Sequence, residues 1–226
     1  MGSVRFPGKM LAELGGRPLL EWVLRRVLHS REIDSACLAT STNARDDELE
    51  NLAARLKVSV FRGDENDVLG RFAEAAQQAH AGTIVRVCAD NPFVAPEEID
   101  RLVRFFAAGD AVYAFNHLDR LGSRYADGFG AEIMRTDVLN EMAGKAADPG
   151  HREHVTTYLW DNATDYSIMV VPPPSELAHP ELRFDVDTPK DLERLEKLVS
   201  AGVSLQTPAA EIVRLALAAS ETICNE

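Results

Sequence analysis

Two cationic residues near the N-terminus lie in a segment that could bind phosphate. The run Gly2-Ser3-Val4-Arg5-Phe6-Pro7-Gly8-Lys9 combines glycines, a hydroxyl and two positive charges. Small residues let backbone N–H groups approach phosphate oxygens, arginine can bind two oxygens at once, and lysine supplies a mobile point charge. The segment therefore suits a triphosphate; the alternative is an ordinary basic tail. It is not the phosphate loop of ATPases, because Met10 follows the lysine where that loop has serine or threonine.

Two carboxylates follow strand-like runs. Asp90 comes shortly after the apolar run 83–88, and Asp187 directly follows the run 182–186. A carboxylate at the carboxyl end of a strand can hold a hard cation such as Mg²⁺, and two such strand ends can converge. Each residue also has a simpler explanation, since Asp90 could end a loop and Asp187 could stabilise the N-terminus of the next helix.

The elements that must position these residues alternate between helix and strand. Apolar residues recur at helical spacing in four segments, 20–27, 49–56, 69–76 and 99–106. Short apolar runs typical of strands occur at 36–39, 58–61, 83–88 and 111–115. Runs too apolar to face water on either side predict a mainly parallel sheet between two helical layers. The predicted fold class is α/β, a Rossmann-like three-layer domain.

The second half departs from this alternation. A polar, glycine-rich stretch at 116–130 opens an insertion of about 116–160, which we interpret as a lid or a homodimer contact. Strand-like runs at 131–134, 167–171 and 182–186 follow. Thr188 is a good N-cap and Pro189 suits the first helical position, and one more helix is predicted near 208–220. The prediction is one domain over 1–200 and a helical tail over 201–226.

Composition excludes several classes of function. Acidic side chains number 36 and basic ones 24, which leaves a charge of -12 that disfavours nucleic-acid or anionic-membrane binding. No segment has the length and apolarity of a membrane span or signal peptide, so a cytoplasmic protein is expected. The three cysteines, Cys37, Cys88 and Cys224, form no metal or redox motif.

Three segments together resemble the cytidylyltransferases that activate sugars and sugar acids, and most closely the branch for spore-coat polysaccharide biosynthesis. Residues 2–9 match the family pattern A-R-x-G-S-x-R-x-P-G-K, residues 61–72 look like F-R-G-x-x-x-D-V-L-x-R-[YF], and residues 186–192 match V-D-T-P-x-D-L. The resemblance implies a nucleotidyltransferase that uses CTP. It also implies that Gly2, Ser3, Arg5 and Lys9 bind the nucleotide, with Arg5 and Lys9 acting in catalysis.

The same resemblance implies Mg²⁺ as the cofactor, held by Asp90 and Asp187 as catalytic metal ligands. Thr40 and Arg71 are weaker predictions for nucleotide binding. Motifs similar to Y-P-D-G-L-D-V-E and R-E-H-V-T predict a sugar or sugar-acid acceptor site at Tyr125, Asp127, Glu132, Arg152 and His154. Ala126 replaces a proline and Gly130 an acid in the first motif, so the resemblance does not identify the acceptor.

Other interpretations stay open. The pair His151 and His154 has metal-ligand spacing, but no third ligand is evident and two side chains on a helix surface are favoured. A glycosyltransferase would use a D-x-D motif, which Asp185-Val186-Asp187 spells late in the chain. A non-catalytic nucleotide-sugar binding protein of the same fold is the other alternative.

The N-terminal motif also raises an expectation about the sheet. In the family an apolar strand precedes A-R-x-G-S, whereas here Met1 stands inside the motif. We expect this first strand to be missing and the sheet to have a gap, because such a strand is normally central and paired on both sides. The alternative is that another segment, such as the C-terminal tail, fills the gap.

Overall fold

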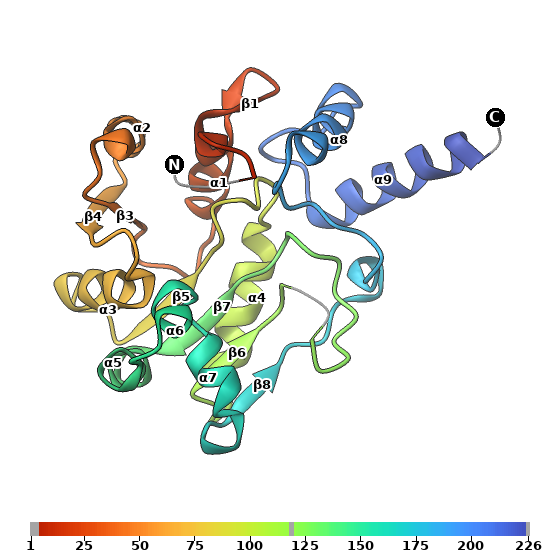
Figure 1. The fold of residues 1–226 in the computed structure, drawn as a ribbon. Coiled ribbons are helices and arrows are strands. Elements are labelled where there is room, and N and C mark those ends of the chain that lie inside the picture. Colours follow the sequence, from red (N-terminus) through yellow and green to blue (C-terminus); the bar gives the residue numbers. More distant parts are fainter. Residues whose placement is uncertain (1–4, 118–119, 225–226) are drawn as a thin grey trace.

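The computed structural model describes residues 5–117 and 120–224, with the backbone alone over 220–224. Its largest sheet has the order β5-β7-β6-β8 and is formed by Thr83–Arg86 (β5), Glu132–Arg135 (β7), Tyr113–Phe115 (β6) and Ile168–Val170 (β8) (Figure 1). β7 pairs antiparallel with both neighbours, and β8 pairs parallel with β6. Three of these four strands therefore run in one direction, in agreement with the mainly parallel sheet predicted from the sequence.

Helices cover the sheets on both faces, and two further helices form most of the C-terminal part of the chain. The described helices are α1 (Leu19–Val27), α2 (Asp47–Arg55), α3 (Val68–Gln78), α4 (Pro96–Ala107), α5 (Thr136–Lys145), α6 (Pro149–Glu153), α7 (Thr157–Asp161), α8 (Pro189–Ser200) and α9 (Ala209–Cys224). Short 3-10 turns lie at Lys9–Leu11, Ala44–Asp46, Ala163–Asp165 and Ser175–Leu177. In the part of the chain described, every helix is too short or too polar to span a bilayer.

Alternate strand residues face two different helical layers. Tyr113 and Phe115 of β6 pack in one apolar cluster with α3, α5 and α7. Ala114, between them, packs with Ile133 in another cluster that includes α1 and α4. Successive side chains of a strand point to opposite faces, so strands that are apolar at every position bury both faces. This arrangement confirms the predicted three-layer α/β fold.

A separate parallel pair completes the described sheets on the N-terminal side. β3 (Cys37–Ser41) pairs with β4 (Ser59–Gly63), and α1 packs against this pair through Leu20 and Leu24. Val23 of α1 packs with the larger sheet. Within residues 5–117 and 120–224, no strand pairs with the free edge of β3 or of β5. The sheet is therefore in two parts, joined in part by α1.

The two free edges bear on the expectation of a gap in the sheet. The C-terminal tail does not fill it as a strand, because α9 is a helix that packs beside α8 and residues 175–177 (Figure 1). Backbone groups along an open strand edge form a template for another strand. The open edges of β3 and β5 could therefore accept a further strand.

Fusing an apolar strand and an Ala-Arg dipeptide upstream of Met1 tests whether the gap accepts a strand. We expect the added strand to pair with β3 and β5 and to raise the melting temperature by about 10 °C, the shift that roughly 3 kcal/mol produces in a domain of this size. A Gly-Ser extension of equal length is the matched control. Equal melting temperatures for the two extended chains would show that the gap accepts no strand.

A hairpin and α8 form the edge of the fold beside the N-terminal segment. The hairpin joins Glu13–Leu14 (β1) to Arg17–Pro18 (β2), and Gly15 and Gly16 in its turn have φ angles of 57° and 71°. A two-residue turn with positive φ at both positions suits glycine. α8 begins with a capping box in which Thr188 and Asp191 exchange hydrogen bonds, as the predicted N-cap requires.

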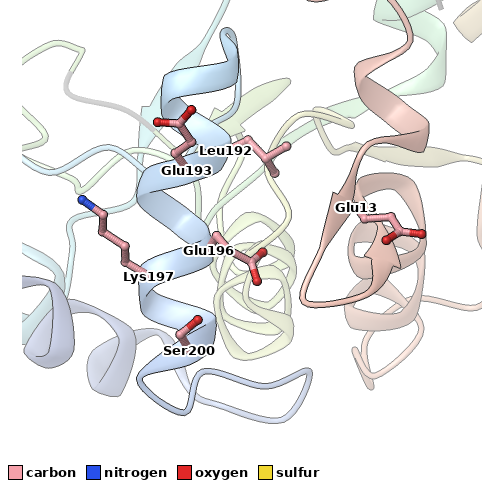
Figure 2. Close-up of a pocket in the computed structure, with 6 residues that line it drawn as sticks. All are labelled: Glu13, Leu192, Glu193, Glu196, Lys197 and Ser200. Carbon is pink, nitrogen blue, oxygen red and sulfur yellow. The ribbon is translucent and has the colours of Figure 1, made fainter.

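A groove of about 520 Å³ lies between this hairpin and α8 (Figure 2). The lining residues are Glu13, Leu192, Glu193, Glu196, Lys197 and Ser200. The Gly15 N–H donates a hydrogen bond of 2.8 Å to the Glu196 carboxylate and so ties the hairpin to the helix. None of the lining residues belongs to the predicted substrate site, and we interpret the groove as a packing seam.

Two segments differ from their predicted form. Tyr125, Ala126 and Phe129 are buried in the core that includes α8 and α9, so the later half of the predicted lid is not a projecting loop. The run 182–186 forms only a bridge between Arg183 and Asp127 instead of a strand. Its backbone pairs with two different loops, because Phe184 N–H donates to the Asp127 carbonyl and Val186 N–H donates to the Asp90 carbonyl.

Candidate functional site

Lys9 joins the segments that carry the two predicted metal ligands. Its ammonium donates hydrogen bonds to Asp90 Oδ2 at 3.0 Å, to the Val186 carbonyl at 2.8 Å and to Asp187 Oδ1 at 3.5 Å. The Lys9 side chain is only 13% exposed, whereas those of Asp90 and Asp187 are 32% and 27% exposed. The carboxylates are therefore open to a ligand, while the ammonium lies beneath the surface.

Local backbone structure brings these groups together. Lys9 starts a 3-10 turn directly after Gly8, whose φ of 73° is in the region that favours glycine. Asp90 follows β5 in a turn closed by the Asn91 N–H and the Cys88 carbonyl, and Val186 donates its N–H to the Asp90 carbonyl at 2.9 Å. Asp187 directly precedes the capped end of α8. The two predicted strand ends thus converge, although only one of them is a regular strand.

Arg5 adds a second cation to the cluster. Its guanidinium lies 3.0 Å from Asp187 Oδ2, and its side chain is 67% exposed. Arg5 is therefore at the mouth of the site, where an incoming anion would meet it first. Gly2 and Ser3, the other predicted residues of this segment, lie outside the described residues.

The donor set around Lys9 fits a magnesium ion. Two carboxylate oxygens and one carbonyl oxygen surround the ammonium, which stands in for a metal cation, and Mg²⁺ prefers such hard oxygen ligands. Among residues 5–117 and 120–224, no group of three His, Cys, Asp or Glu side chains could hold a metal. Asp90 and Asp187 would hold the ion, with water and phosphate oxygens supplying the remaining ligands.

Asp127 is a further carboxylate near this centre. Burial, the charge of Asp185 and the charge of Asp90 raise the pKa of Asp127 to about 6, against the lowering effect of Arg183. Arg183 binds the Asp185 carboxylate at 2.6 Å and lies 3.8 Å from Asp127. The carboxylate of Asp185 is thus committed to Arg183, so only Asp187 of the D-x-D sequence contacts Lys9.

Glu132 is a buried hub at the same edge of the larger sheet. β-sheet register places it opposite Arg86, and the two form an ion pair. Tyr113 donates to Glu132 Oε1 at 2.6 Å, and the Thr156 hydroxyl lies 3.0 Å from the same oxygen. Burial raises the pKa of Glu132, but the Arg86 charge and the hydrogen bonds from Tyr113 and Arg86 outweigh burial and hold the pKa below its usual value.

His117 is a candidate binding residue that the sequence did not indicate. It packs edge-on against Phe115, and its Nδ1 is buried without a hydrogen-bond partner among the described residues. Burial lowers the pKa of His117, so the ring is neutral at pH 7 and one nitrogen can accept or donate. The signal in the sequence is weak, because a lone histidine after a strand has many structural explanations.

Cys88 lies close to charged groups of the Lys9 site and of the Glu132 cluster. Burial raises the pKa of the Cys88 thiol to about 11, and the charges of Arg86, Asp90, Glu132 and Asp127 also act on this thiol. Asp90 and Glu132 therefore both lie within electrostatic reach of this thiol. A thiol with a raised pKa is a poor nucleophile, so Cys88 is unsuited to covalent catalysis.

The two weaker nucleotide-site predictions have different surroundings. The Thr40 hydroxyl is buried and donates to Asp46 at 2.8 Å, so it is already engaged within the protein. Arg71 lies near the start of α3, half-buried, with its side chain beside Gly63 at the end of β4. Its Nε has no hydrogen-bond partner among the described residues. The carboxylates of Asp46, Asp64 and Asp67 act on it electrostatically. Arg71 therefore has hydrogen-bonding capacity for a ligand, whereas Thr40 does not.

The remaining predicted acceptor residues lie in protein contacts or at the surface. Tyr125 is fully buried, and its hydroxyl bonds to Glu98 and Arg101. Arg152 joins Asp67, the N-cap of α3, to the Ala143 carbonyl. His154 is exposed at the end of α6. The structure does not bring these three to the Lys9 site, and their acceptor roles remain predictions.

His151, one of the two histidines predicted to lie on a helix surface, contacts the neighbouring helix α7. His151 Nε2 lies 2.8 Å from Asp161 Oδ2, and its ring contacts Tyr158 edge-on. This contact fixes α6 against α7. In the described part of the chain the two histidines join no metal-binding group, so the surface interpretation of the pair is favoured.

Several known proteins are similar to this chain in sequence and fold over most of its length. Residues 1–221 match the family model for cytidylyltransferase. The spore coat polysaccharide biosynthesis protein SpsF of Bacillus subtilis is 31% identical, covering 95% of this chain and 90% of its own. A 3-deoxy-manno-octulosonate cytidylyltransferase of Anaeromyxobacter sp. is 27% identical, covering 89% and 94%.

A solved cytidylyltransferase from Leptospira borgpetersenii is 27% identical, covers 100% of this chain and 94% of its own, and superposes with a TM-score of 0.90. The sequence match extends across the segments that form the Lys9 site and across both parts of the sheet. The agreement of sequence and fold confirms the predicted resemblance. This chain belongs to the cytidylyltransferase family.

Proposed function

We propose that the protein transfers CMP from CTP to a sugar or sugar-acid acceptor and releases pyrophosphate. The observation that carries this proposal is the convergence of Arg5 and Lys9 with Asp90 and Asp187 at one point. The cations can bind phosphate and the carboxylates can bind a metal, which is the pairing that nucleotidyl transfer needs. The names of the similar proteins, a sugar-acid cytidylyltransferase among them, support the nucleotide and the acceptor class.

In the proposed reaction an acceptor hydroxyl oxygen attacks the α-phosphorus of CTP. A bond forms between this oxygen and phosphorus, the bond from phosphorus to the bridging oxygen breaks, and pyrophosphate leaves with that electron pair while the hydroxyl proton passes to solvent. Arg5 and Lys9 neutralise the β and γ phosphates, which carry the growing charge. Arg71 binds another part of the nucleotide. No protein nucleophile is required, so alignment and charge neutralisation account for catalysis.

Mg²⁺ is the proposed cofactor, and it would supply charge neutralisation at the phosphates when bound. Asp90 and Asp187 would hold it. The acceptor would lie beside them along the edge of the sheet, where Asp127 supplies a carboxylate and His117 a neutral imidazole. Asp127 and His117 could bind sugar hydroxyls directly, whereas Glu132 orients its neighbours from a buried position.

Two further proposals carry over from the sequence. We propose a homodimer, formed partly by the insertion at 116–160, and a cytoplasmic location, where CTP is supplied. Light scattering at micromolar concentration tests the first against a monomer mass of 24.8 kDa. Cell fractionation tests the second.

Calorimetry with the four nucleoside triphosphates in the presence of Mg²⁺ tests which nucleotide base the protein prefers. We expect CTP to bind at least about tenfold more tightly than ATP, GTP or UTP, because one or two well-placed hydrogen bonds to a base discriminate by this amount. Inorganic triphosphate is the control for binding through phosphates alone. Tighter binding of another nucleotide would reject CTP as the substrate without rejecting nucleotidyl transfer as the reaction.

A further inference from the structure

The Lys9 ammonium uses all of its hydrogen-bonding capacity inside the site. An ammonium has three N–H donors, and three oxygens surround this one: Asp90 Oδ2, the Val186 carbonyl and Asp187 Oδ1. With only 13% of the side chain exposed, water has little access to replace these partners. Lys9 therefore neutralises the same two carboxylates that would bind the metal.

A divalent metal ion and the ammonium compete for the same oxygens. If Mg²⁺ entered between Asp90 and Asp187 with Lys9 in place, the metal ion and the ammonium would lie within a few ångströms of each other. Their repulsion would be strong, because solvent and salt screen charges poorly in a partly buried site. Metal binding therefore requires Lys9 to leave. An ammonium that leaves the two carboxylates needs another anionic partner. Asp90 and Asp187 cannot be that partner, because they would then hold the metal.

The triphosphate can be that partner. Arg5 is largely exposed at the mouth of the site and contacts the outer oxygen of Asp187, so a polyphosphate approaching Arg5 also approaches Lys9. Phosphate oxygens offer the lysine several strong acceptors. Once Lys9 turns toward them, both carboxylates are released at the same moment that phosphate oxygens become available to complete the metal's ligands.

We infer that Lys9 holds the place of the metal ion in the free protein and yields it to the metal when triphosphate binds. This inference rests on the proposed function for the identity of the ligand. Binding of metal and triphosphate is then strongly cooperative, and by linkage each must strengthen the other by the same factor. The free protein binds metal weakly, which keeps the centre from filling before the substrate arrives.

Manganese binding to the full chain without nucleotide tests the inference. Mn²⁺ replaces Mg²⁺ in oxygen sites, and its free concentration is measured by electron paramagnetic resonance. We expect Lys9→Met to bind Mn²⁺ at least about tenfold more tightly than the original protein, because a competing unit charge is removed. Lys190→Met is the matched control. Lys190 is exposed near the start of α8 and makes no hydrogen bond or ion pair with the described residues, so its loss should change the affinity by less than about threefold.

Inorganic triphosphate supplies the second arm. It should tighten Mn²⁺ binding by about tenfold or more in the original protein and by a clearly smaller factor in Lys9→Met, because the competing ammonium is already gone. Lys9→Gln, which keeps a polar side chain, and the shift in melting temperature with added Mn²⁺ provide the same comparison if Lys9→Met is unstable. Unchanged or weaker Mn²⁺ binding in both variants would overturn the inference.

The outcome is separable from the proposed function. Cooperative Mn²⁺ and triphosphate binding without CMP transfer to any acceptor would support the exchange at Lys9 and reject the proposed activity. CMP transfer together with an Mn²⁺ affinity that Lys9→Met leaves unchanged would support the proposed activity and reject the exchange at Lys9.

Discussion

Asp187→Asn is expected to slow Mg²⁺-dependent pyrophosphate release from CTP by about 10²–10³-fold or more, the loss typical of removing one charge-stabilising group from an active site. Asparagine keeps the volume of the side chain but removes the negative charge that faces Lys9 and Arg5. Asp90→Asn should behave alike for the same reason. Both variants should remain folded, since the two carboxylates are partly exposed and the residue that caps α8 is Thr188.

Asp185→Asn is the matched control for this experiment. Its carboxylate is held by Arg183 and makes no contact with Lys9, so its removal should alter turnover far less than that of Asp187. The pair of variants also separates the nucleotidyltransferase from a D-x-D glycosyltransferase, in which both aspartates of the motif are needed. Near-normal turnover and unchanged metal dependence in Asp90→Asn and Asp187→Asn would reject the metal assignment.

Glu132→Gln is expected to lower the free energy of unfolding by about 3–5 kcal/mol, because it leaves the Arg86 charge unpaired in the sheet. A loss of this size lowers the melting temperature by roughly 10 °C in a chain of this length. Glu141→Gln is the control. Its pair with Lys145 lies on the exposed face of α5, where ion pairs contribute about 0–1 kcal/mol.

A double variant makes the reason for the loss testable. Arg86→Met combined with Glu132→Met removes both charges, and replacing a buried ion pair by apolar side chains is often close to neutral. The double variant should therefore be more stable than Glu132→Gln. If Glu132→Gln is as stable as Glu141→Gln and affects only the acceptor KM, Glu132 contacts the acceptor instead of supporting the sheet.

The stability that Glu132 supplies should depend on pH in a defined direction. Its folded pKa is lower than the ordinary value of 4.5, so the contribution is complete above pH 4.5 and is lost as pH falls through the folded pKa. The difference in stability between the original protein and Glu132→Gln should therefore narrow as the solution is acidified below pH 4.5. Urea melts of both proteins across this range measure it.

Sequence patterns located the main parts of this site because each has a local signature. Helical spacing and a strand run predicted the layers, and Thr188 with Pro189 predicted the start of α8. The carboxylates Asp90 and Asp187 were placed near each other because they end strand-like runs. These patterns depend on residues that are neighbours in sequence, so they can be recognised without knowledge of the tertiary packing.

Other parts of the site depend on contacts between segments far apart in the chain. The Val186 carbonyl bonds to Lys9 across 177 positions, and a backbone oxygen leaves no mark in the sequence. Glu132 is predicted as an acceptor residue because its motif resembles Y-P-D-G-L-D-V-E, whereas the register of β7 places it opposite Arg86 inside the sheet. A charged residue in each of two apolar strands was the available signal for that ion pair.

Pyrophosphate release tests the central proposal most directly. The four nucleoside triphosphates are each incubated with Mg²⁺ and a panel of 2-keto sugar acids, other sugar acids and sugar phosphates, and the products are analysed by mass spectrometry. We predict release with CTP and at least one sugar or sugar-acid acceptor, in equal amount with a CMP conjugate of that acceptor, and none with Asp187→Asn. Binding of CTP with no pyrophosphate or conjugate formed from any acceptor would contradict the account and favour a non-catalytic binding protein.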